Sequence, residues 1–294
     1  MHRIALHLLV VAALSFLSAC RSPAVASPDL ATAQAPISQP FLWQVTKADG
    51  SATGYLLGTM HIGIDAEKQF PPLVWDTLAK ADSVCLEADT RDLSLAREMI
   101  RSDGTTLDSE VGPEVWAQLT EIVGARRARI MNKLKPSAAS AFLMVEGMPK
   151  TPPMDDTVRK RATRAGTPVE FLEEGRFQLQ LLEKYFTADS IKAMVENHAD
   201  LQQESLHMAA VYASGDADAL HAMMVDDEQW EANGGEAALE AMLFTRNADW
   251  VGKYTAMMDK GTPFCAVGAG HLVGERSLTD LLENDGYTVT RLTP

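Results

Sequence analysis

Short apolar runs alternate with longer segments of helical periodicity along the chain from about Phe41. "FLWQVTK" and "GYLLGTM" are separated by "ADGSAT", in which Asp49-Gly50 is a typical turn pair, so they predict a β-hairpin. Further strands are predicted by "SVCLEA" at 83–88, "TPVEFLE" at 167–173, "PFCAVG" at 263–268 and the final "GYTVTRL". Strands separated by helical segments predict an α/β sheet.

Residues 174–260 follow a helical pattern almost throughout. One face of a helix that Gly215 would end carries Ile191, Met194, Val195, His198, Leu201 and Met208. A second face, at near-heptad spacing, carries Leu239, Leu243, Trp250 and Met257. Near the C-terminus, Ser277 with Asp280 predicts the start of a helix and Gly286 its end.

The N-terminal residues predict an export signal and a tether, not part of a fold. Arg3 precedes an apolar stretch of about 14 residues, which is shorter than the roughly 20 needed to span a bilayer. The stretch ends in Leu-Ser-Ala-Cys20, which resembles the lipobox of bacterial lipoproteins and makes residues 1–19 a signal peptide and Cys20 the lipidated residue. Arg21, where an Asp would favour retention in the inner membrane, implies the outer membrane.

Composition defines the domain and narrows the classes of partner. Residues 20–40 are rich in Ala, Ser and Pro and predict a flexible tether, followed by a single domain over 41–294. The chain is 46% hydrophobic, which is ordinary for a folded domain, and its formal charge of −14 argues against nucleic acid or anionic lipid as the main partner. Cys85 and Cys265 lie in apolar runs, so two buried thiols are favoured over a disulfide.

Two of the predicted strands end in the same short motif. "YLLGTMH" at 55–61 and "CAVGAGH" at 265–271 are each an apolar triplet followed by Gly-x-x-His. Gly58 and Gly268 let the backbone turn or approach a ligand closely, and strand ends border the ligand crevice of an open α/β sheet. Because imidazole is a common neutral metal ligand, His61 and His271 are candidate ligands of one ion. The alternative is a pair of tight turns without chemistry.

Two charged side chains occupy positions that the pattern marks as buried. Glu87 ends the run "SVCLE", where a carboxylate must be solvated, paired or bound to a cation. Arg246 lies on the apolar stripe of its helix, so its guanidinium needs a carboxylate or a substrate oxyanion. Glu87, Asp155 and Glu173 are candidate partners, either in a structural ion pair or in a catalytic role.

Together these motifs resemble the TraB/GumN/PrgY family, which includes the Tiki metalloproteases. The marks, spread over nearly all of 41–294, are "YLLGTMHIG", "CLEAD", "MDDTVRKRATRAGTPVEFLEEGRFQ", "FTRNADW" and "AVGAGHLVGERSLTDLLENDGYTV". The resemblance implies an α/β fold like that of erythromycin esterase and ChaN-like proteins, with a mixed central sheet, flanking helices and a large helical elaboration. It also implies an active centre formed by His61, His271 and Glu87 and supported by Asp155, Glu173, Arg246 and Asn247.

The resemblance leads to the hypothesis of a divalent-metal-dependent hydrolase, in particular a peptidase, acting on a peptide or small molecule. Manganese or cobalt is the ion it implies, with zinc as a further option. His61 and His271 would hold the ion, and Glu87 would complete the coordination or act as general base on bound water. Arg246 would stabilise a developing oxyanion or hold Glu87 in place.

Two other hypotheses remain at this stage. The first is an envelope lipoprotein that binds haem or a peptide without turnover, because ChaN-like relatives are lipoproteins that bind haem. Haem is disfavoured by Glu87 and Arg246, since a porphyrin face requires apolar walls. The second is a structural envelope protein in which the glycines only permit tight turns.

Overall fold

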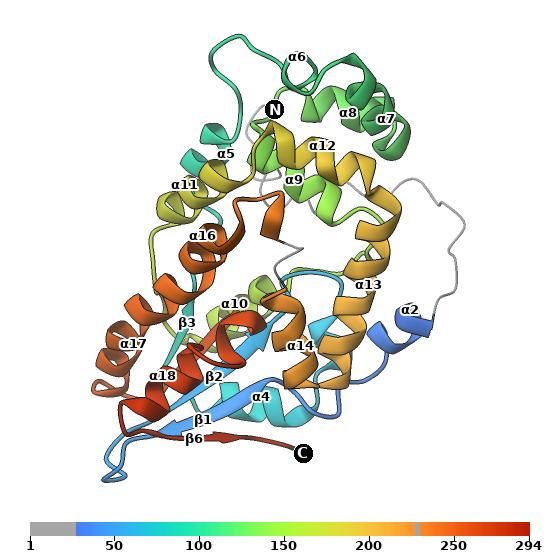
Figure 1. The fold of residues 1–294 in the computed structure, drawn as a ribbon. Helices are drawn as coiled ribbons and strands as arrows, with labels where there is room; N and C mark the ends of the chain where they lie inside the picture. Colours follow the sequence, from blue (N-terminus) through green and yellow to red (C-terminus); the bar gives the residue numbers. More distant parts are fainter. Residues whose placement is uncertain (1–27, 227–229) are drawn as a thin grey trace.

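The computed structural model describes residues 28–226 and 230–294 (Figure 1). The predicted signal peptide, residues 1–19, and the predicted lipidation site Cys20 lie outside these ranges. No helix within the described ranges combines the length and the apolar character needed to cross a membrane.

A six-stranded mixed sheet forms the centre of the fold (Figure 1). Its strands are β1 (Leu42–Thr46), β2 (Thr53–Thr59), β3 (Ser83–Leu86), β4 (Val169–Phe171), β5 (Pro263–Gly268) and β6 (Thr288–Arg291). They lie in the order β4-β3-β5-β2-β1-β6. Strands β4, β3, β5 and β2 run parallel, whereas β1 is antiparallel to both β2 and β6. The predicted α/β sheet and its first hairpin are therefore confirmed.

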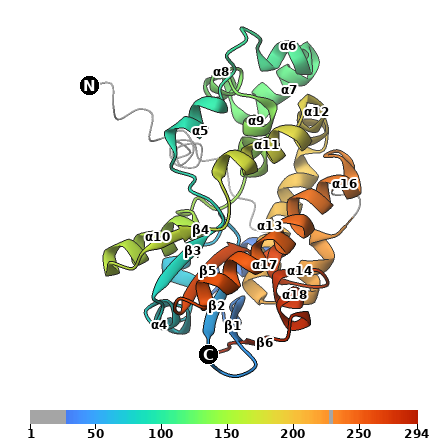
Figure 2. The same cartoon turned by 90° about the vertical axis from the view of Figure 1, so that its left-hand side faces the viewer.

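Helices surround the sheet and extend away from it (Figures 1 and 2). Before β4 they are α2 (Pro28–Ala33), α3 (Ala66–Gln69), α4 (Pro72–Leu78), α5 (Leu93–Glu98), α6 (Leu107–Val111), α7 (Pro113–Val123), α8 (Ala125–Met131), α9 (Pro136–Met144) and α10 (Met154–Ala165). After β4 they are α11 (Gly175–Tyr185), α12 (Ala188–Glu196), α13 (His198–Ser214), α14 (Ala217–Met224), α16 (Gly235–Leu239), the π-helix η1 (Glu240–Phe244), α17 (Thr245–Met258), the 3₁₀ turn η2 (Ala269–Leu272) and α18 (Leu278–Asn284).

The helix predicted to end at Gly215 is two helices in the structure. Helix α12 ends before Asn197, whose backbone (φ −107°, ψ 26°) leaves the helical region, and α13 begins at His198. Asn197 Nδ2 donates to the carbonyl of Ala193, so this side chain competes with the backbone ladder at the break. Gly215 ends α13 in a left-handed conformation, as predicted.

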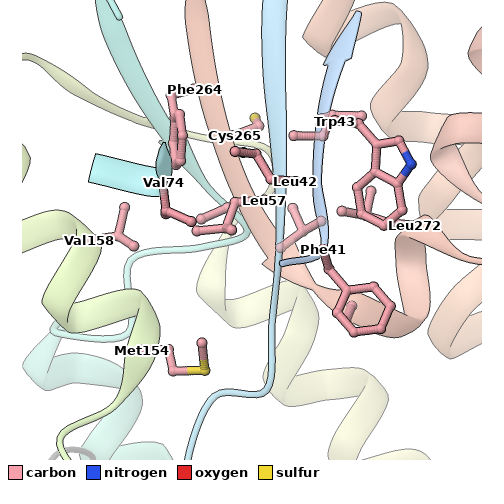
Figure 3. Close-up of a cluster of buried hydrophobic side chains, with 14 of the residues drawn as sticks. Phe41, Leu42, Trp43, Leu57, Val74, Met154, Val158, Phe264, Cys265 and Leu272 are labelled. Atoms are coloured by element: carbon pink, nitrogen blue, oxygen red, sulfur yellow. The ribbon is translucent and has the colours of Figure 1, made fainter. Parts of the chain in front are cut away.

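Apolar side chains pack on both faces of the sheet (Figure 3). Val74 of α4 and Val158 of α10 lie on one face, and Trp43 and Leu272 lie on the other. A second, separate cluster is formed by helices α6 to α9 and α12, with Leu107, Leu119, Met131, Leu143 and Ile191 fully buried. The helical elaboration therefore has a hydrophobic core of its own.

The chain is folded before the predicted domain boundary at Phe41. Ala33 and Ile37 are buried in the main core. Gln69 Nε2 donates to the carbonyls of Ala33 and Ala35, and Ile37 N–H donates to the carbonyl of Gln69. The predicted tether is therefore wrong for residues 31–40, because a few small or apolar side chains in an Ala- and Pro-rich segment are enough to dock it.

The two cysteines of the sheet lie beside each other. Cys85 of β3 is the register partner of Cys265 of β5. Both are fully buried free thiols, as predicted.

Four parallel strands end at the same edge of the sheet. Strand β2 is followed by His61, β3 by Glu87, β4 by Glu173 and β5 by His271. In an α/β sheet the carboxyl ends of parallel strands border the ligand site, so this edge is the candidate functional site.

Candidate functional site

His61 is an exposed histidine held by a carboxylate. Its Nδ1 lies 2.7 Å from Oδ2 of Asp155, and Thr59 donates to the other oxygen, Oδ1, at 2.8 Å. Asp155 stands in the first turn of α10, and the N–H of Met154 donates to the His61 carbonyl at 2.8 Å. His61 has a φ of +30°, a strained conformation for a non-glycine residue, and its side chain is 59% exposed. The anchored ring therefore presents Nε2 outward.

Glu87 is an almost buried carboxylate with three donors. Its Oε1 accepts the N–H of Gly268 at 2.7 Å. Its Oε2 accepts Arg246 Nη2 at 2.6 Å and Gln178 Nε2 at 2.8 Å. Of the environments that the sequence allowed, the carboxylate is paired.

Arg246 is the buried cation of the site, with a side chain only 6% exposed. Its Nε and Nη2 donate to Glu173 at 3.0 and 2.7 Å, and Nη2 also donates to Glu87. Its Nη1 donates to the Met242 carbonyl at 2.9 Å, within the π-helix η1. Two of the three predicted partners are therefore correct, whereas Asp155 binds His61 instead.

His271 is a buried histidine with both ring nitrogens engaged. Its Nδ1 lies 2.7 Å from Oδ1 of Asn247, an atom that only accepts, so Nδ1 carries the proton. Its Nε2 then accepts from Arg246 Nη1 at 3.1 Å. The Trp250 ring packs 4.5 Å from the imidazole, and Trp250 Nε1 donates to Glu173. His271 therefore belongs to a fixed polar network beneath the surface.

The network sets the charge of each group. Attraction to Asp155 outweighs burial and raises the pKa of His61 to about 9. Burial would raise the pKa of Glu87, but Arg246 and the neighbouring histidines hold it well below its usual range. Burial lowers the pKa of His271 to about 3. At neutral pH the site therefore holds an ionised Glu87, a neutral His271 and a protonated His61.

A small cavity of about 190 Å³ opens at this edge of the sheet. His61, Glu87 and Asp155 line it, whereas Arg246, Glu173, Asn247 and His271 do not. A Cβ at Gly268 would lie 3.5 Å from His61 Nε2 and 3.4 Å from Glu87 Oε1, so this glycine keeps open the space between them. The predicted residues thus form an upper layer that faces the cavity and a lower layer that supports it.

Gln178 is a site residue that the sequence did not assign a role. It lies in α11, lines the cavity and donates to Glu87. The only signal was its place at the end of the "EGRFQ" motif, which gives no information on what the amide contacts.

The expected divalent ion does not fit these side chains as they lie. His271 Nε2, the nitrogen left to coordinate, accepts a hydrogen bond from a guanidinium, and the same guanidinium neutralises Glu87. Over the described ranges, no group of three or more His, Cys, Asp or Glu side chains is arranged to hold a metal ion. Only His61, with a carboxylate behind Nδ1 and a free Nε2, has the arrangement of a metal-ligating histidine.

Comparison with known proteins gives one match. The sequence model of the TraB/PrgY/gumN family matches residues 41–291, a range that contains every residue of both layers. No curated protein and no solved structure matches the chain.

Proposed function

Because the chain belongs to the TraB/PrgY/gumN family, we propose that it is a hydrolase whose active centre is the cavity at His61 and Glu87, with a peptide as the expected substrate. The observation that carries the proposal is the juxtaposition of an exposed imidazole, backed by Asp155, with an ionised carboxylate across Gly268. Two groups with opposite pKa shifts at one cavity are the usual arrangement for proton transfer.

His61 is the residue that moves the proton in this proposal. Asp155 fixes the ring through Nδ1, so Nε2 is the atom that reaches a substrate. In its protonated form it donates to the leaving group, and in its neutral form it accepts a proton from attacking water. The arrangement is that of the His–Asp pair of other hydrolases, in which the carboxylate orients the ring and stabilises its cation.

Glu87 is a poor general base because three hydrogen bonds and the Arg246 charge stabilise its ionised form. We therefore assign it the role of a fixed negative charge that favours the cationic form of His61. Of the two roles predicted for Arg246, holding Glu87 in place is favoured, since the guanidinium is buried and does not line the cavity.

Metal dependence stays a prediction. Manganese or cobalt, with zinc as a further option, would have to take His271 Nε2 from Arg246. The metal content of the purified protein, after supply with each ion, tests this in the parent and in His271→Gln. A stoichiometric ion that is lost in the variant would support the prediction, and a parent without any transition metal would reject it.

Peptide cleavage by the full chain carrying Cys20→Ala tests the hydrolase itself. A mixture of peptides is incubated with the parent, with His61→Ala and with His207→Ala, which removes an exposed histidine of α13 far from the motif. Loss of at least ~100-fold in rate is expected for His61→Ala alone. Equal rates in all three proteins would sink the proposal.

Binding without turnover is the second outcome of that experiment. The cavity of about 190 Å³ is smaller than the ~300–1,000 Å³ of typical small-molecule pockets, and charged residues line it, so haem is not favoured. A peptide that binds the parent but is never cleaved would make the protein a peptide-binding member of its family.

The proposed location is the cell envelope, as an outer-membrane lipoprotein on its periplasmic or surface face. It rests on residues 1–21 alone. Incorporation of labelled palmitate into the parent and its loss in Cys20→Ala would support this location. Incorporation in neither protein would remove it.

A further inference from the structure

A groove of about 380 Å³ beside α8 combines apolar walls with cations. It is lined by Ile100, Ile130 and Leu134 and by Arg126, Arg129 and Lys133. Ile130 is 45% exposed, which is unusual among the large apolar side chains of the described chain. No acidic side chain of residues 28–226 or 230–294 lines the groove.

These three cations differ from the other basic residues of the same region. Three neighbours are in ion pairs of 2.6 Å: Arg101 with Glu110, Arg127 with Glu146, and Lys135 with Glu183. By contrast, Arg126, Arg129 and Lys133 are exposed and have no carboxylate partner in the described part of the chain. Their charge is therefore available to an external anion.

The groove stands apart from the candidate active site. Both views place α6, α7 and α8 at the end of the molecule opposite to α4 and β6 (Figures 1 and 2). Ala128 and Met131 anchor α8 in the separate core of the elaboration, so its outer face is held rigidly.

We propose that this groove is a docking surface for a bilayer that contains anionic phospholipid. Arginine and lysine side chains at such a surface bind the headgroups, while an exposed aliphatic side chain between them enters the headgroup and acyl boundary. A solvated protein or nucleic acid partner would offer Ile130 no comparable apolar layer. The contact is independent of the proposed catalytic function and of acylation at Cys20.

The net charge of −14 does not oppose this contact, although it argued against anionic lipid as the main partner of the whole chain. Charges further away than about 10 Å are largely screened at 0.1 M salt, so the local charge of the groove decides the contact. Each cation near an anionic surface strengthens partitioning by roughly fivefold.

Flotation with lipid vesicles tests the docking surface. The full chain carrying Cys20→Ala is mixed with phosphatidylcholine vesicles and with the same vesicles containing phosphatidylglycerol. Binding to neutral vesicles measures the contribution of the N-terminal apolar stretch, and the increase with phosphatidylglycerol measures the groove. We expect an increase that weakens with salt, is lost at least ~tenfold in R126E/R129E/K133E, and falls severalfold in Ile130→Ser.

The matched control is K80E/R164E/K260E, which makes the same change in net charge at exposed cations outside the groove. It should retain most of the phosphatidylglycerol-dependent binding, and thermal unfolding verifies that both triple variants are folded. Equal losses in the two triple variants would overturn the proposal in favour of net charge. No dependence on phosphatidylglycerol, or binding of inorganic phosphate or an acidic protein without vesicle binding, would overturn it as well.

Discussion

Nη1 of Arg246 lies 3.1 Å from Nε2 of His271, so the lone pair of the buried histidine accepts a hydrogen bond from a cation. The same guanidinium binds Glu87 after β3 and Glu173 after β4. One arginine thus connects three strand ends, and the consequences of its removal are predictable.

Arg246→Met should lower the free energy of unfolding by about 3–5 kcal/mol, because it leaves Glu87 and Glu173 buried without a counter-charge. Arg276→Met is the matched control, since its ion pair with Glu240 is exposed on both sides and should contribute no more than ~1 kcal/mol. Chemical denaturation measures both. Similar small losses in the two variants would show that the buried network is not under charge stress.

His61 should titrate near pH 9 in metal-free protein, and Asp155→Asn should move its pKa down towards the ordinary 6.5. A raised pKa stabilises the fold most below about pH 6.5, and the contribution is lost as the pH rises through about 9. NMR of the imidazole carbons follows the titration, and thermal unfolding between these two pH values follows the stability. A parent His61 that titrates near 6.5 would contradict the coupling.

The two motif glycines should respond oppositely to alanine. At Gly58 the new Cβ would lie 2.9 Å from the Cβ atoms of Phe41 and Ala269, so Gly58→Ala should cost about 1–3 kcal/mol of stability. At Gly268 the contacts of 3.4–3.5 Å are ordinary, so Gly268→Ala should stay within ~0.5 kcal/mol of the parent.

Gly268→Ala should nevertheless abolish peptide cleavage, because its methyl group would lie between His61 and Glu87. Unfolding curves and cleavage rates of the two glycine variants, measured side by side, separate packing from function. Full activity in Gly268→Ala would place the substrate elsewhere.

Gln178→Leu should cost about 1.5–3 kcal/mol, because it removes a hydrogen bond to an ionised carboxylate. Gln178→Glu places a second carboxylate against Glu87, and like charges at this distance cannot both ionise freely. Its penalty should therefore be larger at pH 8 than at pH 5, whereas that of Gln178→Leu should vary less. Thermal unfolding at the two pH values distinguishes them, and equal pH dependence would argue against the contact.

The strand ends of the site could be predicted because each is marked locally. An apolar run followed at once by Glu87, or by glycine and then His61 or His271, is visible in a few letters. The topology then brings these residues together, because β2, β3 and β5 are parallel and adjacent.

The pairing of the charged residues could not be predicted, because it depends on helices that arrive from far along the chain. Asp155 reaches His61 across 94 positions, and Arg246 reaches Glu87 across 159. The sequence gives three acids of equal standing for Arg246, and only the position of α10 assigns Asp155 to His61. The break at Asn197 was hidden for a related reason, since the apolar periodicity continues across it.

The π-helix before Arg246 has a consequence for the length of this segment. A π turn is equivalent to one residue inserted into an α-helix, and here it joins α16 to α17. Deleting Ala241 would restore regular winding and rotate one helix against the other by roughly 100°. The apolar side chains ahead of the turn and the arginine behind it could then no longer both meet their partners. A single surplus residue keeps the two halves of this helix in phase with different neighbours.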